Sequence, residues 1–192
     1  MNRKNLCIIG VGQIGSRHLQ ALKAVKTPLE ILVVDQSENS LKISKERSES
    51  MNTSGGEHVL NYQNQLPENS VFDVAIIATT SGPRAVITKE LLKKNKVKYL
   101  ILEKILFQKK NAYAEIEKLL TKNRVKTWVN CPMRMMPFYA NLKNEFGGKK
   151  ITYTLYGNQS GLATDLIHHV DFVSFLTGST NFKVDTRLLD KK

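Results

Sequence analysis

The sequence has few cysteines, no long apolar run and fewer acidic than basic residues. Its two cysteines, Cys7 and Cys131, form no CxxC pair and lack metal-ligand spacing, so we expect two small buried side chains and no metal site. No segment has the roughly 20 apolar residues that cross a bilayer. The apolar run near the N-terminus is too short for an export signal. We therefore expect a cytoplasmic protein with no membrane partner.

The shortage of acidic residues leaves a large positive charge. Asp and Glu number 17 against 29 Lys and Arg, a formal net charge of +12. Such an excess can serve nucleic-acid binding. The lysines are spread over expected helix ends and turns, however, and are not interleaved with the aromatic side chains that stack on bases. The charge therefore favours anionic small molecules as partners, and we expect no nucleic-acid partner.

Short β-branched runs alternate with amphipathic stretches over the first 130 residues. This alternation is typical of βαβ units on a parallel sheet, and helical spacing of apolar residues supports the intervening helices. We expect an α/β fold, a Rossmann-type doubly wound parallel sheet, in a domain of residues 1–130. The expected strands are 6–9, 31–34, 58–60, 72–78, 99–102 and 126–131, and the expected helices are 14–25, 86–92 and 112–122.

The pattern changes near residue 131. A short helix is expected over 137–146, an alternating strand over 149–157, and an apolar helix over 161–178 that ends at Gly178. The tail from residue 180 has the composition to begin one more strand. Residues 131–192 are therefore expected to form a truncated α+β second domain.

Three glycines follow the first expected strand on a G-x-G-x-x-G spacing. Gly10, Gly12 and Gly15 stand between that strand and a helix, which is the context that gives the motif meaning. In this setting the glycines allow a tight turn, close approach of a pyrophosphate and close helix packing. The helix N-terminus, which begins with Gln13 and Ile14, supplies unpaired N–H groups for the phosphates.

An acidic residue ends the second expected strand. Asp35 lies about 20 residues past the glycine motif, where a carboxylate accepts hydrogen bonds from an adenosine ribose. The same charge repels a 2′-phosphate and favours NAD over NADP, although Ser37, Lys42 or Lys45 could accommodate that phosphate. Two alternatives stay open: S-adenosylmethionine enzymes also use glycine turns with a following acidic residue, and a glycine turn can serve helix packing alone.

Four further stretches resemble the Gfo/Idh/MocA family of NAD(P)-dependent oxidoreductases over residues 5 to about 178. These are the strand end at 77–79, the segment 103–105 in place of E-K-P, the N-x-R-x-x-P-like segment 130–137, and the Asp/His segment 165–171. The resemblance implies that a dinucleotide binds the Rossmann domain and that a second domain packs over it. It also implies cofactor contacts from Ala78, Thr79, Thr80, Glu103 and Lys104.

The resemblance implies catalytic roles as well. Lys104, just past a strand's carboxyl end, would hold the substrate hydroxyl. Asp165 precedes His168 and His169 by three and four positions, so on a helix it can contact either ring and raise its basicity for proton removal. His168 matches the family's H-x-x-D with Asp171, and His169 matches its D-x-x-x-H with Asp165. We favour His168 as the base and keep His169 as its rival.

Three departures from the family pattern bear on function. Ile105 replaces the proline of E-K-P, so we expect an altered turn after Lys104. Arg84 stands where histidine is common in the family, and its charge favours either an acidic substrate or the capping of a loop. Only residues 131–192 follow the nucleotide domain, and the family's second domain is a large open sheet. We expect either a homo-oligomer through the second domain, or a short variant or fragment.

These observations together predict an NAD-dependent oxidoreductase. It would interconvert a secondary alcohol and a ketone on a sugar, sugar acid or nucleotide-sugar by hydride transfer. The alternative is a dinucleotide-binding protein without catalysis, whose substrate domain is too reduced to close a pocket.

Overall fold

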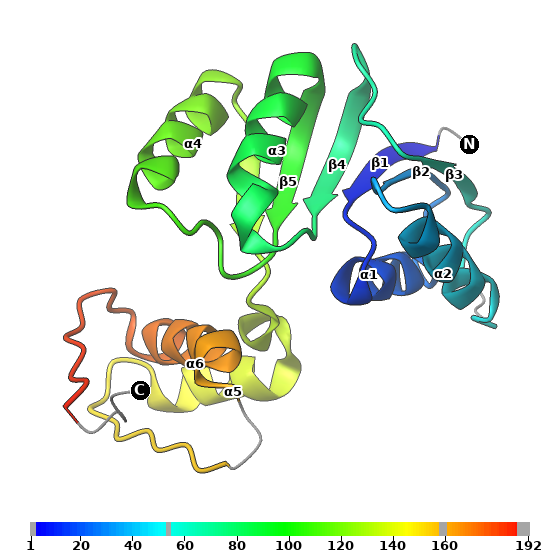
Figure 1. Cartoon of the computed structure of the whole chain (residues 1–192). Helices are drawn as coiled ribbons and strands as arrows, with labels where there is room; N and C mark the ends of the chain where they lie inside the picture. Colours follow the sequence, from blue (N-terminus) through cyan, green and yellow to red (C-terminus); the bar gives the residue numbers. More distant parts are fainter. Residues whose placement is uncertain (1–2, 53–54, 158–160, 188–192) are drawn as a thin grey trace. The chain divides into compact units, whose positions relative to one another are not determined.

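A computed structural model describes residues 3–52, 55–157 and 161–187 of the chain (Figure 1). The chain divides into two compact units, Met1–Asn130 and Cys131–Lys192. The first unit contains a sheet with α-helices, and the second contains only helices among its described residues.

Six parallel strands form the sheet of the first unit. Their order is β3-β2-β1-β4-β5-β6. Successive strands are added on one side of β1 up to β3 and on its other side from β4 onward, so the order of addition reverses between β1 and β4. Ligands of open α/β sheets bind outside the strand carboxyl ends at this kind of switch point. The predicted Rossmann-type doubly wound sheet is confirmed. The strands are β1 Lys4–Ile9, β2 Leu29–Val34, β3 Val59–Gln63, β4 Val71–Ile77, β5 Lys96–Leu102 and β6 Lys126–Val129.

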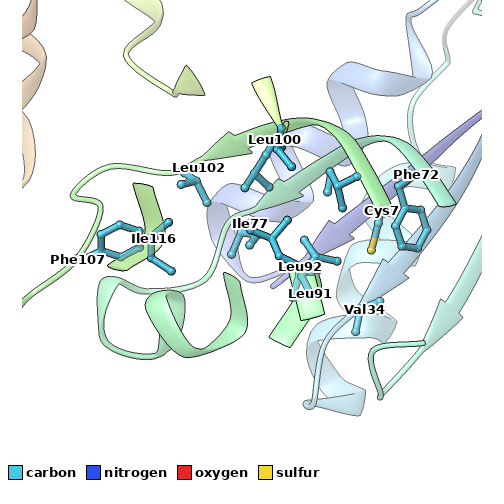
Figure 2. Close-up of a cluster of buried hydrophobic side chains, with 14 of the residues drawn as sticks. Cys7, Val34, Phe72, Ile77, Leu91, Leu92, Leu100, Leu102, Phe107 and Ile116 are labelled. Carbon is cyan, nitrogen blue, oxygen red and sulfur yellow. The ribbon is translucent and has the colours of Figure 1, made fainter. Parts of the chain in front are cut away.

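Helices cover both faces of this sheet. Successive residues of the central strands are buried on opposite faces, so each face needs a covering layer. The helices α1 (Gln13–Lys23) and α2 (Glu38–Glu49) lie side by side, as do α3 (Ser81–Lys94) and α4 (Lys110–Lys122) (Figure 1). Leu6 and Ile8 of β1 share a buried cluster with Leu19 of α1. Cys7 and Ile9 join the other cluster, which includes residues of α3 and α4 (Figure 2). Successive residues of the central strand thus face opposite layers.

The helix α2 is the element of this unit that the sequence pattern did not predict. Its buried residues are Ser44 and Ser48, so no apolar stripe marks it. Ser37 caps it, because the Ser37 hydroxyl accepts a hydrogen bond from the backbone N–H of Ser40 at 3.2 Å. The helix begins at this cap and packs against α1 through residues that periodicity does not reveal.

The second unit contains a short 3₁₀ helix and two α-helices. These are η1 (Pro132–Met135), α5 (Pro137–Phe146) and α6 (Leu162–Thr177). Tyr139 of α5 packs edge to face on Phe172 of α6, with ring centroids 4.9 Å apart. Lys143 Nζ donates to the carbonyls of Phe175 and Leu176 at the end of α6. Gly178, with φ of 73°, ends α6 as the sequence predicted.

The strand predicted over residues 149–157 is wrong. Residues 150–157 have no regular secondary structure, and residues 180–186 are equally irregular. The end of the predicted tail strand, 188–192, lies outside the described residues. An isolated strand leaves its N–H and C=O groups unpaired, and the described part of this unit offers it no neighbouring strand. The α+β expectation for this unit is therefore wrong for the residues described.

Candidate functional site

The glycine loop packs tightly against the end of β4. Gly10 has φ of 84°, and a Cβ built on it would lie 2.7 Å from Thr79 Cγ2 and 2.8 Å from the Thr79 backbone nitrogen. A Cβ on Gly15 would lie 1.8 Å from the Gly10 carbonyl oxygen. Side chains at these two positions would therefore separate β1, α1 and β4.

The space beside Gly12 is open, in contrast to its two neighbours. A Cβ built there meets no atom within 4 Å. Gly12 is the N-cap of α1, and no side chain caps the helix there. The N–H groups of its first turn, which includes Gln13 and the half-exposed Ile14, have no partner within the helix. This unfilled cradle of backbone donors fits a dinucleotide diphosphate.

Asp35 lies directly beside this cradle. Its carboxylate accepts a hydrogen bond from the Val11 backbone N–H at 2.7 Å and another from the Ser37 N–H at 2.9 Å. It therefore ties the glycine loop to the carboxyl end of β2. Each carboxylate oxygen has further lone pairs, so these bonds leave acceptor capacity for ribose hydroxyls.

The predicted cofactor residues after β4 lie next to the glycine loop. Ala78 extends the sheet, because its N–H donates to the Ile9 carbonyl at 2.8 Å. Thr79 contacts Gly10 as described above, and its buried Oγ1 has no hydrogen-bond partner among the described residues. Thr80 is the N-cap of α3 and makes no side-chain cap bond. The structure thus brings the glycine loop, Asp35, Ala78 and Thr79 to one edge of the sheet.

Arg84 is a buried loop cap. Its side chain is almost fully buried, and its guanidinium donates to the carbonyls of Thr79, Glu103, Ile105 and Leu106. Burial lowers the pKa of this guanidinium, and the nearby Glu103 charge partly opposes that shift. Of the two interpretations offered by the sequence, the structure supports capping, because these carbonyls occupy the guanidinium.

Glu103 directly follows β5 and lies inside a buried hydrogen-bond network. Its Oε1 accepts from His18 Nε2 at 2.7 Å and from Asn130 Nδ2 at 2.6 Å. Burial alone would raise the pKa of Glu103, but the bonds from His18 and Asn130 outweigh it and hold the pKa below its ordinary value. The sequence predicted Glu103 and missed its partners. His18 is a polar residue among the apolar residues that recur at helical spacing in α1. A polar residue at such a position is the sequence signal that could have identified it.

Lys104 follows Glu103 at the carboxyl edge of the sheet. Its side chain is half-buried, and the peptide bond to Ile105 is cis. The backbone N–H of Glu103 donates to the Ile77 carbonyl at 3.1 Å, so Lys104 comes directly after the last sheet bond of β5. The predicted lysine and the predicted cofactor residues therefore all belong to the first unit.

The predicted acid and histidines lie in the second unit, on α6. Asp165 Oδ2 accepts from the Gly161 backbone N–H at 3.1 Å, at the start of the helix. His169 Nδ1 lies 2.6 Å from the Tyr153 hydroxyl, and the two rings stack with centroids 5.7 Å apart. His168 is half-buried. Sequence reasoning missed Tyr153 because it placed this residue in a strand.

Another motif pair meets within the second unit. Arg134 Nε donates to Asp171 Oδ2 at 3.0 Å, and its Nη2 donates to the other carboxylate oxygen. This two-bond contact joins η1 to α6. Asp171, the acid of the H-x-x-D match, thus holds the arginine of the segment 130–137.

Comparisons with known proteins agree with this geometry. A family model described as the oxidoreductase family with an NAD-binding Rossmann fold, Gfo/Idh/MocA, matches residues 4–131. A search of the curated proteins gave no match. No helix among the described residues is long and apolar enough to span a membrane.

Solved structures of three dehydrogenases are similar in fold. They are scyllo-inositol dehydrogenase from Lactobacillus casei with NAD(H) and scyllo-inositol (17% identity, TM-score 0.66), myo-inositol 2-dehydrogenase from Lactobacillus plantarum (17%, 0.69), and the WlbA dehydrogenase from Chromobacterium violaceum with NADH and UDP-GlcNAcA (16%, 0.64). Each match covers 92% of this chain and only 56% or 57% of the other chain. At these identities the likeness concerns the fold.

Proposed function

The chain belongs to the Gfo/Idh/MocA oxidoreductase family, which has an NAD-binding Rossmann fold, and from this premise we propose that it is an NAD-dependent dehydrogenase. It interconverts a secondary alcohol and a ketone on a sugar, sugar acid or nucleotide-sugar. The observation that carries the proposal is the open space at Gly12, beside uncapped amides of α1 and the Asp35 carboxylate. Inositol and UDP-GlcNAcA in the similar structures support the substrate class.

NAD is the proposed cofactor, and it supplies the hydride acceptor when bound. The first turn of α1 holds its diphosphate, and Asp35 accepts hydrogen bonds from its adenosine ribose. NADP is disfavoured because the Asp35 carboxylate repels a 2′-phosphate.

Lys104 and a histidine of α6 supply the proposed chemistry. The Lys104 ammonium holds the substrate oxygen and lowers the free energy of the alkoxide that forms as its proton leaves. One histidine takes that proton. The H-x-x-D match supports His168. The Tyr153 contact supports His169, because an Nδ1–H that donates to the Tyr153 hydroxyl leaves the Nε2 lone pair to take the substrate proton. Separate His168→Ala and His169→Ala variants decide between them, since only the base variant loses turnover while keeping NADH affinity.

The test of the proposal separates binding from turnover. NADH fluorescence titrations measure affinity, and a panel of inositols, sugar acids and nucleotide-sugars measures turnover. Lys104→Ala is expected to lose turnover and still bind NADH, whereas the surface control Lys109→Ala keeps both turnover and wild-type NADH affinity. Retained turnover in Lys104→Ala would remove Lys104 from the mechanism.

A dinucleotide-binding protein without catalysis is the second candidate. The chain spans 56% or 57% of the three similar dehydrogenases, and its second unit contains no strand in its described residues. This candidate expects NADH binding with no turnover across the whole panel. The homo-oligomer expected from the resemblance stays a prediction, which the mass of the chain in solution tests.

A further inference from the structure

Three separate parts of the first unit meet at the Glu103 carboxylate. His18 reaches it from α1, Asn130 is the residue after β6, and Glu103 itself is the residue after β5. Both donors use the same oxygen, Oε1, at 2.7 and 2.6 Å. This oxygen therefore joins the helix that begins at the glycine loop to the strand that precedes Lys104.

The network keeps a charge inside the protein. The Glu103 side chain is only 6% exposed, and an ionised carboxylate with so little water needs protein donors. Because its pKa lies below the ordinary value, Glu103 is a carboxylate at neutral pH and accepts both bonds. His18 therefore donates from Nε2–H. Removing this donor leaves Oε1 with its bond from Asn130, so the orientation of the carboxylate is held less firmly.

The orientation of this carboxylate matters to Lys104. Glu103 also accepts a hydrogen bond from the Lys104 backbone N–H. Arg84 donates to the carbonyls of Glu103 and Ile105, on either side of Lys104. The backbone at Lys104 is thus fixed from two directions, by the Glu103 carboxylate and by the Arg84 guanidinium.

We propose that His18 is a positioning residue for Lys104, acting through the Glu103 carboxylate. Its imidazole sets the rotamer of Glu103 and thereby the turn that carries the lysine. The inference rests on the proposed function of Lys104. It goes further by making the lysine's placement depend on a side chain of the phosphate-binding helix.

The experiment compares His18→Leu with His18→Gln in the full chain. Leucine fills similar volume without a donor, and glutamine keeps an N–H donor. The first readout is the pH dependence of Lys104 modification by an amine-reactive reagent, followed by mass spectrometry of the labelled peptide. The second is kcat on the best substrate of the panel, with NADH affinity from fluorescence. Lys109, in the same samples, is the internal labelling control.

We expect His18→Leu to shift the Lys104 labelling profile and lower kcat between about ten- and a hundredfold, as a misplaced catalytic group does. NADH affinity and Lys109 labelling stay within about twofold of wild type, and His18→Gln restores most of both losses. A folded His18→Leu variant with a wild-type Lys104 profile overturns the inference. If the chain turns over no substrate, the proposed function fails while the labelling profile still tests His18.

A second variant covers the case in which His18→Leu does not fold. Glu103→Gln keeps the shape of the side chain and loses the charge that His18 and the Lys104 amide contact. We expect Glu103→Gln to change the pH dependence of Lys104 labelling, as His18→Leu would. An unchanged profile in a folded Glu103→Gln variant also overturns the inference.

Discussion

Gly12 and Gly15 lie three residues apart at the start of α1, and the space around them differs completely. Alanine at Gly15 would place its Cβ against the Gly10 carbonyl, whereas alanine at Gly12 meets no protein atom. We expect Gly15→Ala to destabilise the fold by about 1–3 kcal/mol. Gly12→Ala should change stability by less than about 0.5 kcal/mol and weaken NADH binding at least about tenfold, since its Cβ enters the phosphate space.

Urea unfolding and NADH titration of both variants check this contrast. Gly12→Ala and Gly15→Ala serve as controls for each other, because one tests ligand space and the other tests packing. Equal losses of stability in the two variants would contradict the described loop, and wild-type NADH affinity in Gly12→Ala would contradict its role.

Glu103 gives stability a defined pH dependence. Its pKa is lower in the folded protein than the unfolded value of about 4.3. Folding therefore favours the carboxylate, and this contribution is complete above about pH 4.3 and is lost as the pH falls through the folded pKa. We expect the difference in unfolding free energy between wild type and Glu103→Gln to shrink from about pH 7 to about pH 3. Urea titrations across this range measure it, and a constant difference would show that folding does not lower the pKa of Glu103.

Cys7 should be chemically inert in the native chain. Burial raises the pKa of its thiol to about 12, and the thiolate is the reactive form. We expect a thiol reagent at about pH 8 to modify Cys7 only after denaturant is added. Peptide mass spectrometry identifies the modified residue. Rapid modification of Cys7 in the folded chain would contradict its burial in the core.

Single residues of the site were predictable only where spacing along the chain carries the signal. Gly10, Gly12, Gly15 and Asp35 follow a fixed separation around one strand and helix, so the sequence was sufficient to predict that they come together. The contact of His18 with Glu103 joins residues 85 positions apart, and only the sheet order makes them neighbours. Arg84 was ambiguous for the same reason.

Elements were predictable where an apolar pattern marks them. The strands β1, β2, β4 and β5 have buried residues on both faces, and their apolar runs were clear. The buried residues of helix α2 are serines, so no apolar pattern marks it and it was missed. The strand predicted over 149–157 alternates as a strand does, yet pairing with a second strand decides whether such a segment is a strand.

The end of α6 depends on one glycine. Gly178 has φ of 73°, a backbone conformation that residues other than glycine rarely adopt. We expect Gly178→Ala to destabilise the chain by about 1 kcal/mol, against no measurable change for the exposed control Thr180→Ala. Thermal unfolding followed by circular dichroism makes this comparison, and equal melting temperatures for the two variants would contradict the left-handed cap.

The whole molecule combines a complete nucleotide fold with a second unit of helices. The first unit contains both buried clusters of the sheet, and its strand order is the one typical of Rossmann folds. The second unit exposes large apolar side chains such as Met135, Phe138 and Tyr156. Its apolar pattern predicted the two α-helices correctly and did not predict that these side chains are exposed, since exposure depends on neighbours outside the local sequence.

Binding of NADH to the wild-type chain is the most direct test of the central claim. A ligand that binds only the native state stabilises it by about 2.7 kcal/mol at a hundredfold excess over its Kd. The measurement is the unfolding free energy with and without NADH, in wild type and in Gly12→Ala. The account predicts stabilisation of wild type and little in the variant. No stabilisation of wild type at millimolar NADH, or equal stabilisation of both, would contradict it.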